Sequence, residues 1–372
     1  MATATMVGAA AVKAGLTRPV GCVSALPDFG RVDLPGYGDL VFGGHDIAGG
    51  SVPKRAEQLV QARVLPQGLP ELVEPDLVAA DEEIRPGPLR DGAAPRAAVD
   101  AMVADLEDFR ARHGLDRVVV VNVSSTETPL ADPPPPEYLS LAAFRDALAA
   151  GTGTFPAGVL AAFAAFTAGC PFVDFTPSTG ARPPALAELA DRCRVPYAGS
   201  DGKTGETLVK SALAPMFARR ALRVHAWTGT NLLGGGDGET LADATRAAGK
   251  IESKRRVLAE ILDHPVDDGV HIHNVPELGE WKTAWDHIAF EGFLGARMTM
   301  QITWQGCDSA LAAPLVLDLV RFTAAAHRDG RHGPLAELGF FFKDPLGSRE
   351  HRLERQYETL VRWANGLPGR RS

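Results

Sequence analysis

Apolar positions along the chain follow two spacings, which predict a series of alternating helices and strands. Between 97 and 113, Val99, Met102, Leu106 and Phe109 recur at the spacing of one helix face. The valines at 118–121 follow as an unbroken apolar run, typical of a buried strand. The same order returns as an Ala-rich helical segment at 141–168, a strand at 171–178 and a helix at about 183–193. This alternation predicts an α/β fold with a parallel, doubly wound sheet and ligands at the strand ends.

The first hundred residues give weaker signals. Residues 1–16 are rich in Ala and end at Gly15, which predicts a helix with a glycine stop. The apolar run from Asp39 to Ile47 predicts a short strand that ends at Gly43 and Gly44, either near a ligand or in a plain turn. Residues 67–97 are dense in Pro and charge, so we expect irregular connections with one short helix.

Beyond Asp201 the pattern changes to that of a mixed α+β domain. It predicts a helix at 207–220, a strand at 222–228, a glycine-rich loop and a helix at about 240–262. Residues 270–273 and 297–304 alternate like strands with one solvated face. Helices at 309–327 and about 349–364 would return to the first domain. We therefore predict domains at 1–206, 207–308 and 309–372.

Composition narrows the classes of function. The chain has 372 residues, of which 45% are apolar, and this balance is that of a globular protein. Its net charge of -8 argues against a nucleic-acid partner, which needs a broad basic surface. No apolar run approaches the roughly 20 residues of a membrane helix, and no secretion signal opens the chain. The four cysteines lack CxxC spacing, so we expect free thiols, a cytoplasmic location and no membrane partner.

Several residues are candidates for chemistry, each with a plainer alternative. Lys250 and Lys254, four apart on a predicted helix, could clamp a phosphate or simply form a solvated charged face. The glycines and Asp237 at 234–238 could cradle an anion or link two elements. Residues 199–207 lack the spacing of a nucleotide-triphosphate loop. His271 and His273 have no third ligand at suggestive spacing, so we expect no metal site.

Six segments occur in an order and spacing that together resemble the inositol-1-phosphate (inositol-3-phosphate) synthase family. They span 201–211, 231–238, 250–254, 279–282, 307–319 and 342–346. Weaker similarity runs through 43–47, 118–127 and 171–178, so the resemblance covers nearly the whole chain.

The resemblance implies a Rossmann-like NAD-binding domain with an inserted catalytic and oligomerisation domain, commonly in a homotetramer. It implies cyclisation of D-glucose 6-phosphate to 1D-myo-inositol 3-phosphate through oxidation at C5, loss of a C6 proton, aldol closure on C1 and re-reduction. It places the catalytic residues at Asp201, Lys250, Lys254, Lys282, Asp308 and Lys343. It places the cofactor-binding residues at Asp46, Ser124, Ser125, Asn231, Gly235 and Asp237.

A lysine cluster suits that chemistry. A phosphate dianion needs cationic anchors, and an enolate oxygen needs a nearby positive charge. Crowded ammonium groups should lower the pKa of at least one of them toward neutrality. Our hypothesis assigns Lys250 and Lys343 to proton transfer and oxyanion stabilisation, and Lys254 and Lys282 to the phosphate and neighbouring hydroxyls.

Two departures from the family leave alternatives open. Gly235 and Gly236 stand where relatives carry asparagines, so the substrate could be another sugar phosphate, such as fructose 6-phosphate closed to a five-membered cyclitol. The chain also opens directly on the helix that follows the family's first strand and glycine turn. Either the start was assigned too far downstream or part of the dinucleotide site is lost. A non-catalytic sugar-phosphate-binding relative and a simple dehydrogenase therefore remain competing hypotheses.

Overall fold

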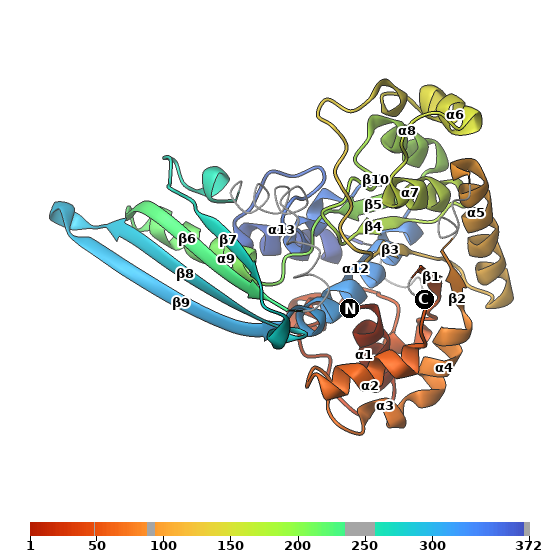
Figure 1. Ribbon diagram of the computed structural model, residues 1–372, viewed down its shortest axis with the longest axis horizontal. Coiled ribbons are helices and arrows are strands. Elements are labelled where there is room, and N and C mark those ends of the chain that lie inside the picture. Colours follow the sequence, from red (N-terminus) through yellow and green to blue (C-terminus); the bar gives the residue numbers. More distant parts are fainter. Residues whose placement is uncertain (48, 88–93, 235–256, 368–372) are drawn as a thin grey trace.

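A computed structural model describes residues 1–47, 49–87, 94–234 and 257–367, and it shows an α/β body from which a second sheet extends (Figure 1). The body is built on a parallel four-stranded sheet with the order β10-β5-β4-β3. Its strands are β3 (Val120–Asn122), β4 (Phe172–Asp174), β5 (Pro196–Gly199) and β10 (Gly333–Pro334).

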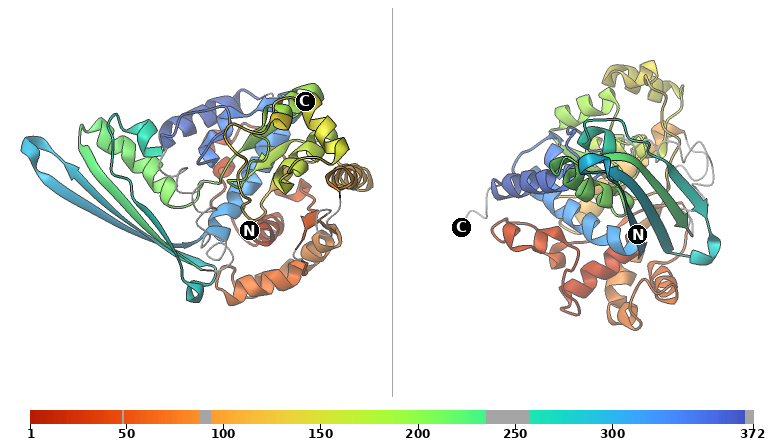
Figure 2. Two further views of the ribbon diagram at one scale, coloured as in Figure 1. Left: turned by 45° about the horizontal axis from the view of Figure 1, so that its top comes forward. Right: turned by 90° about the vertical axis from the view of Figure 1, so that its left-hand side faces the viewer.

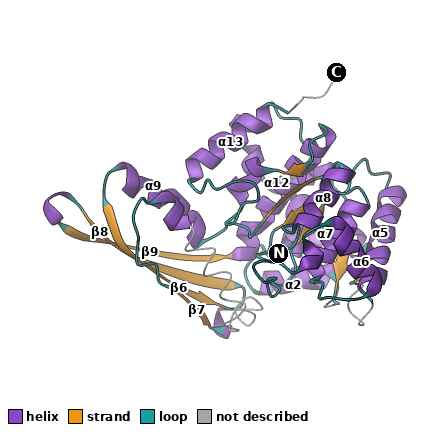
Figure 3. Ribbon diagram, turned by 90° about the horizontal axis from the view of Figure 1, so that it is seen from above, coloured by secondary structure: helices purple, strands orange, loops and turns teal. Residues whose placement is uncertain are grey.

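Helices cover both faces of this sheet, which confirms the predicted doubly wound arrangement (Figure 3). Successive residues of β4 point to opposite faces: Phe172 packs among four helices on one side, and Val173 packs against two helices on the other. The first group is α5 (Pro95–Arg112), α6 (Leu141–Ala150), α7 (Ala157–Thr167) and α8 (Pro184–Cys193). The second is α12 (Asp308–Arg328) and α13 (Leu353–Asn365), with a 3-10 helix at Ala336–Phe341.

The segment predicted as one helix at 141–168 is two helices. α6 ends where Gly151 adopts a left-handed conformation with φ of +66°, and Pro156 caps the start of α7. Because Phe144 of α6 stacks on Phe163 of α7, the two helices share the same core.

The first hundred residues form a smaller layer. α1 (Ala2–Lys13) ends just before Gly15, as predicted, and packs against α12. The strand predicted at 39–47 was wrong in extent. Tyr37–Asp39 forms a 3-10 turn, and the strand covers only Gly44–Asp46. The segment at 67–97 was predicted to be irregular with one short helix, but it forms two short helices, and Leu77 and Ala80 of the second are buried in a core cluster. The remaining elements are β1 (Gly44–Asp46), β2 (Ile84–Pro86), α2 (Val52–Gln61), α3 (Leu69–Leu72) and α4 (Glu74–Glu82).

β3 is less buried than the sequence predicted. Its three residues are half-buried, whereas β4 and β5 are fully buried. The reason is that β3 is the edge of its sheet: it pairs with β4, and β1 and β2 pair only with each other among the described strands. An edge strand keeps one row of backbone groups and part of its side chains accessible.

A second sheet with the order β7-β6-β8-β9 projects from the body, and α9 (Glu206–Arg219) covers one of its faces (Figure 2). Phe217 of α9 packs against Trp227 at the centre of that covered face. The outer face is solvated, as predicted, and the mixture of parallel and antiparallel pairs confirms the α+β pattern. The strands are β6 (Arg223–Leu233), β7 (Val270–Asn274), β8 (Trp281–Glu291) and β9 (Arg297–Cys307).

α12 joins the two sheets and forms much of the core. By length and composition it could cross a membrane, but most of it is buried inside the protein, as in the core helix of a globular fold. Its buried Asp318 accepts hydrogen bonds from the backbone and hydroxyl of Ser24, which ties the loop after α1 to the core. All four cysteines are free thiols, as expected.

Asp174, at the carboxyl end of β4, is a buried acid held in a tight space. Its Oδ1 accepts hydrogen bonds from the amide and hydroxyl of Thr176 at 3.0 and 2.7 Å. Its Oδ2 has no hydrogen-bond partner among the described residues and lies so close to Gly180 that a Cβ there would be 1.9 Å away. Burial raises the pKa of this carboxyl to about 7.

Asp174→Asn should therefore flatten part of the pH dependence of folding. Because the folded pKa lies above the unfolded value near 4, the native state loses stability as pH rises from about 4 to 7 and Asp174 ionises. The amide has the shape of the protonated acid but no charge, so the variant should be more stable by ~2 kcal/mol at pH 8. Urea unfolding at pH 5 and pH 8 measures this, with exposed Asp146→Asn as the matched control. An equal response of both variants to pH would contradict it.

Candidate active site

The site is organised by two chain segments that pair at the carboxyl end of β5. Backbone hydrogen bonds join Lys203 to Phe341, Lys343 to Asp201 and Leu346 to Gly199 at 2.9, 2.7 and 2.8 Å. This short antiparallel pairing sets Lys343 directly opposite Asp201. Their side chains meet as a buried ion pair, with Nζ of Lys343 2.7 Å from Oδ1 of Asp201. Two predicted catalytic residues, 142 positions apart, are thus brought together.

A second predicted pair forms where the two sheets meet. Lys282 is near the start of β8 and lies opposite Gly306 of β9, beside the first residue of α12, Asp308. The Lys282 ammonium donates to Oδ1 of Asp308, and the same oxygen accepts from the hydroxyl of Thr204 at 3.1 Å. Asp308 also places a negative charge at the N-terminus of α12, where the helix dipole favours it.

These groups surround a pocket at the N-terminus of α9. Lys282, Lys343 and Asp308 line it, together with residues from β6 and β7 and the first turn of α9. The remaining lining residues are Thr204, Gly205, Glu206, Thr207, Asn231, Leu233 and Ile272. Two lysines and the open first turn of a helix give the pocket the character of an anion site. The buried hydroxyl of Thr207 has no hydrogen-bond partner among the described residues.

A buried charge network lies behind this pocket. Lys210, four residues after Glu206 on α9, has Nζ 3.3 Å from Oε1 of Glu206 and 2.9 Å from Oδ1 of Asp268. Oε2 of Glu206 accepts a hydrogen bond of 2.6 Å from the side-chain amide of Asn231 on β6. Glu206, Lys210 and Asn231 are all nearly inaccessible to solvent. The sequence indicated Asn231 but not its two partners, although the four-residue spacing of Glu206 and Lys210 was a visible signal.

Lys203 is a third residue to which the sequence analysis assigned no role. It is fully buried, and desolvation lowers the pKa of its amine to about 7. Its Nζ donates to Oε1 of Gln356 on α13, and Gln356 also donates to the carbonyl of Gly339. Lys203 thus ties the pocket loop to α13 and to the segment that carries Lys343. Burial, not crowding with other ammonium groups, lowers this pKa, so the predicted lowering of a pKa within the lysine cluster stays a prediction.

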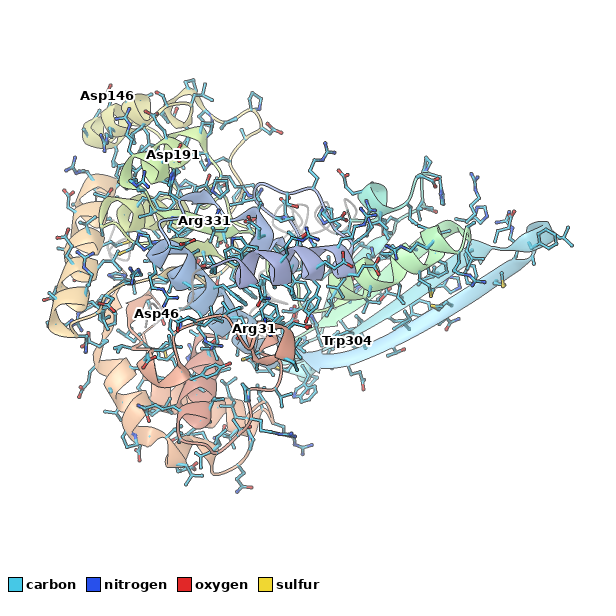
Figure 4. The ribbon with its side chains drawn as sticks, turned by 180° about the vertical axis from the view of Figure 1, so that it is seen from behind. Arg31, Asp46, Asp146, Asp191, Trp304 and Arg331 are labelled. Atoms are coloured by element: carbon cyan, nitrogen blue, oxygen red, sulfur yellow. The ribbon has the colours of Figure 1, made fainter. Side chains whose placement is uncertain are left out.

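The predicted cofactor-binding residues lie in two places. Asn231 lines the pocket, whereas Asp46 ends β1 and Ser124 and Ser125 follow β3. These last three are at carboxyl ends of parallel strands, the usual position of ligands in such sheets. Asp46 and Ser124 are exposed, and Figure 4 shows Asp46 well apart from the sheet that carries Trp304. Lys250, Lys254, Gly235 and Asp237 lie outside the described residues.

Comparison with known proteins identifies the family. A family model described as myo-inositol-1-phosphate synthase, whose name marks it as NAD-binding, matches residues 2–365. Inositol-3-phosphate synthase 1 of Bacteroides thetaiotaomicron is 33% identical over 98% of this chain and 90% of its own. The chain belongs to the myo-inositol-1-phosphate synthase family. The human inositol-3-phosphate synthase 1 is 31% identical over 89% of this chain, which spans 65% of the human protein's length.

Solved structures of the family share the fold. Inositol-3-phosphate synthase from Caenorhabditis elegans matches with a TM-score of 0.83 at 22% identity, covering 99% of this chain and 84% of that one. A myo-inositol-1-phosphate synthase-related protein from Thermotoga maritima matches with a TM-score of 0.76 at 24% identity, covering 99% and 96%. These structures confirm the Rossmann-like architecture, and the family's named members are enzymes.

Gly205→Ala should damage the pocket while leaving the fold intact. A Cβ at this position would lie 2.6 Å from Nζ of Lys282, so the flexible lysine must move away from Asp308. We expect at least a tenfold loss of affinity for inorganic phosphate, because a charge-assisted contact is worth ~1.5–3 kcal/mol. Isothermal titration measures this. Gly8→Ala in α1 is the control, since a Cβ there would meet nothing within 4 Å. Unchanged phosphate affinity in Gly205→Ala would contradict the assignment of Lys282.

Proposed function

We propose that this protein cyclises D-glucose 6-phosphate to 1D-myo-inositol 3-phosphate with NAD as a recycled cofactor. The observation that carries the proposal is the pocket at the start of α9, beside which lie a buried lysine–carboxylate pair, Lys343 with Asp201, and a partly buried one, Lys282 with Asp308. Family membership supports it, since the relatives of this chain are named inositol-3-phosphate synthases. The pocket has the charges that a phosphorylated sugar requires.

The phosphate would bind at the first turn of α9. Backbone amides at a helix N-terminus have no partner within the helix and favour an anion. Lys282 lies beside this turn and supplies a positive charge, and the Thr207 hydroxyl supplies a further donor. This agrees with the assignment of Lys282 to the phosphate. Lys254, the other residue assigned to it, stays a prediction.

Lys343 would act on the reacting carbons. As an ammonium ion paired with Asp201, it places a positive charge where an enolate oxygen can be stabilised. Oδ2 of Asp201 is buried and has no hydrogen-bond partner among the described residues, so it can accept a proton or a hydrogen bond from a substrate hydroxyl. Lys250, assigned together with Lys343 to proton transfer and oxyanion stabilisation, stays a prediction.

The residues at the strand ends fit a dinucleotide. Asp46 is an exposed acid at the end of a parallel strand, and an acid in this position suits ribose hydroxyls. Ser124 is an exposed hydroxyl at the end of β3, and its own Oγ donates to Asn122 at 2.7 Å. When bound, NAD supplies reversible hydride transfer at a carbon that carries a hydroxyl.

The direct test is product formation by the purified chain. With glucose 6-phosphate and NAD⁺, ³¹P and ¹H NMR should show an inositol phosphate without net accumulation of NADH. Fructose 6-phosphate is the parallel substrate, and turnover of it alone would assign a different cyclitol phosphate. Net NADH would indicate a simple dehydrogenase. Binding without turnover, even in a variant extended at its amino terminus by a strand and glycine turn, would favour a non-catalytic relative.

Substitution of Lys343 and substitution of Lys282 should change different kinetic constants. Lys343→Met should lower kcat by about 100-fold, because removing one group that stabilises a developing oxyanion typically costs that much. Lys282→Met should mainly raise KM for glucose 6-phosphate, by about tenfold or more, because it removes a phosphate contact. Lys13→Met is the control, as Lys13 forms an exposed ion pair with Asp76. A KM effect without a kcat effect in Lys343→Met would contradict its assignment.

We also propose that the protein forms a homotetramer in the cytoplasm. The outer face of the second sheet exposes Trp285, and the tip of its β8–β9 hairpin exposes Phe293 and Leu294 at 88% and 89%. Exposed apolar groups of this size favour contact with another copy. Light scattering should give four times the chain mass, and Phe293→Glu with Leu294→Glu should give a smaller species. A wild-type monomer would contradict the proposal.

A further inference from the structure

The hydrogen bond between Glu206 and Asn231 determines which end of an amide faces the ligand pocket. Both residues line the pocket, and both side chains are almost completely buried. The side-chain nitrogen of Asn231 lies 2.6 Å from Oε2 of Glu206. An ionised carboxylate can only accept hydrogen bonds, so the amide must turn its NH₂ group toward Glu206.

Lys210 fixes the charge and orientation of Glu206. Its Nζ lies 3.3 Å from Oε1, the oxygen that does not contact Asn231. An ammonium ion at this distance favours the ionised carboxylate and occupies one of its two oxygens. Asp268 holds Lys210 from the other side at 2.9 Å. Glu206 is therefore anchored between a cation and an amide, each on its own oxygen.

We infer that Glu206 is a positioning residue, which makes Asn231 present its oxygen to the pocket and thereby selects a sugar hydroxyl at this wall. The inference rests on the proposed function. Lys282, Lys343 and the first amides of α9 all donate hydrogen bonds. A hydroxyl that accepts a hydrogen bond from one of these donors can also donate a hydrogen bond of its own. The Asn231 oxygen accepts that hydrogen bond. Phosphate oxygens cannot receive a hydrogen bond from the Asn231 oxygen, because both groups are acceptors. The phosphate end of the substrate is therefore directed toward α9.

Glu206→Gln should reverse this arrangement without changing the size of the side chain. The end of the new amide that faces Lys210 must be its oxygen, because Lys210 can only donate. The NH₂ end then faces Asn231, whose own amide must flip and present NH₂ to the pocket. The side of the pocket formed by Asn231 then donates hydrogen bonds instead of accepting them.

The test compares two probes by isothermal titration on the full chain: glucose 6-phosphate, which carries hydroxyls, and inorganic phosphate, which does not. We expect Glu206→Gln to lower the ratio of sugar-phosphate to phosphate affinity by about tenfold, the effect of one hydrogen bond at a buried site. Loss of the negative charge alone would strengthen both probes and leave the ratio unchanged. Glu354→Gln, in an exposed ion pair with Arg219, is the matched control.

Asn231→Ala separates positioning from a general structural effect. It should lower the same ratio, and adding Glu206→Gln to it should change the ratio no further, because the amide that Glu206 orients is gone. A wild-type ratio in either single variant would overturn the inference, as would an undiminished effect of Glu206→Gln in the Asn231→Ala background. If Glu206→Gln does not fold, a wild-type ratio in Asn231→Ala still overturns the inference.

Failure of the inference and failure of the proposed function look different. The proposed function fails if the wild type binds glucose 6-phosphate but forms no cyclised product. The inference fails if the affinity ratio does not respond to the variants, whether or not turnover occurs. A wild type that does not bind glucose 6-phosphate overturns both.

Discussion

The candidate site depends on the backbone pairing between residues 199–203 and 341–346. This pairing joins the end of β5 to the segment before α13, and it sets Lys343 opposite Asp201. Arg182, from the loop after β4, reinforces it through an ion pair of 2.7 Å with Asp344. The two residues of the ion pair are 142 positions apart in the sequence, and this pairing brings them together. Asp201 and Lys343 are thus held at the carboxyl edge of the parallel sheet by two paired segments rather than by one loop.

The ion pairs around the pocket offset the free-energy cost of burying lysine side chains. A buried ammonium ion costs several kcal/mol unless a carboxylate and further hydrogen bonds offset the lost hydration. Lys343, Lys282 and Lys210 each have a carboxylate partner. Lys203 contacts an uncharged amide instead, and burial lowers its pKa to about 7. The pocket can therefore hold positive charge toward a ligand while the fold around it stays closely packed.

The sequence predicted the architecture where periodicity was long and consistent. α5 and α12 match their predicted ranges closely, because their apolar stripes span several turns. The burial of β3 could not be predicted, because it depends on how many strands flank it rather than on its valines. The joint spacing of short motifs found Lys282 and Lys343 although each is unremarkable alone. Lys203 and Glu206 were missed because their importance comes from contacts with Gln356 and Asn231, far away in sequence. The domain limits at 206 and 308 stay a prediction.

The measurement that tests the account most directly is a crystal structure of the protein with glucose 6-phosphate and NAD⁺. The account predicts phosphate oxygens within hydrogen-bond distance of the first amides of α9 and of Nζ of Lys282. It also predicts Nζ of Lys343 and the Asp201 carboxylate beside the sugar carbons that react. A phosphate bound elsewhere, or a sugar that contacts neither Lys282 nor Lys343, would contradict the central claim.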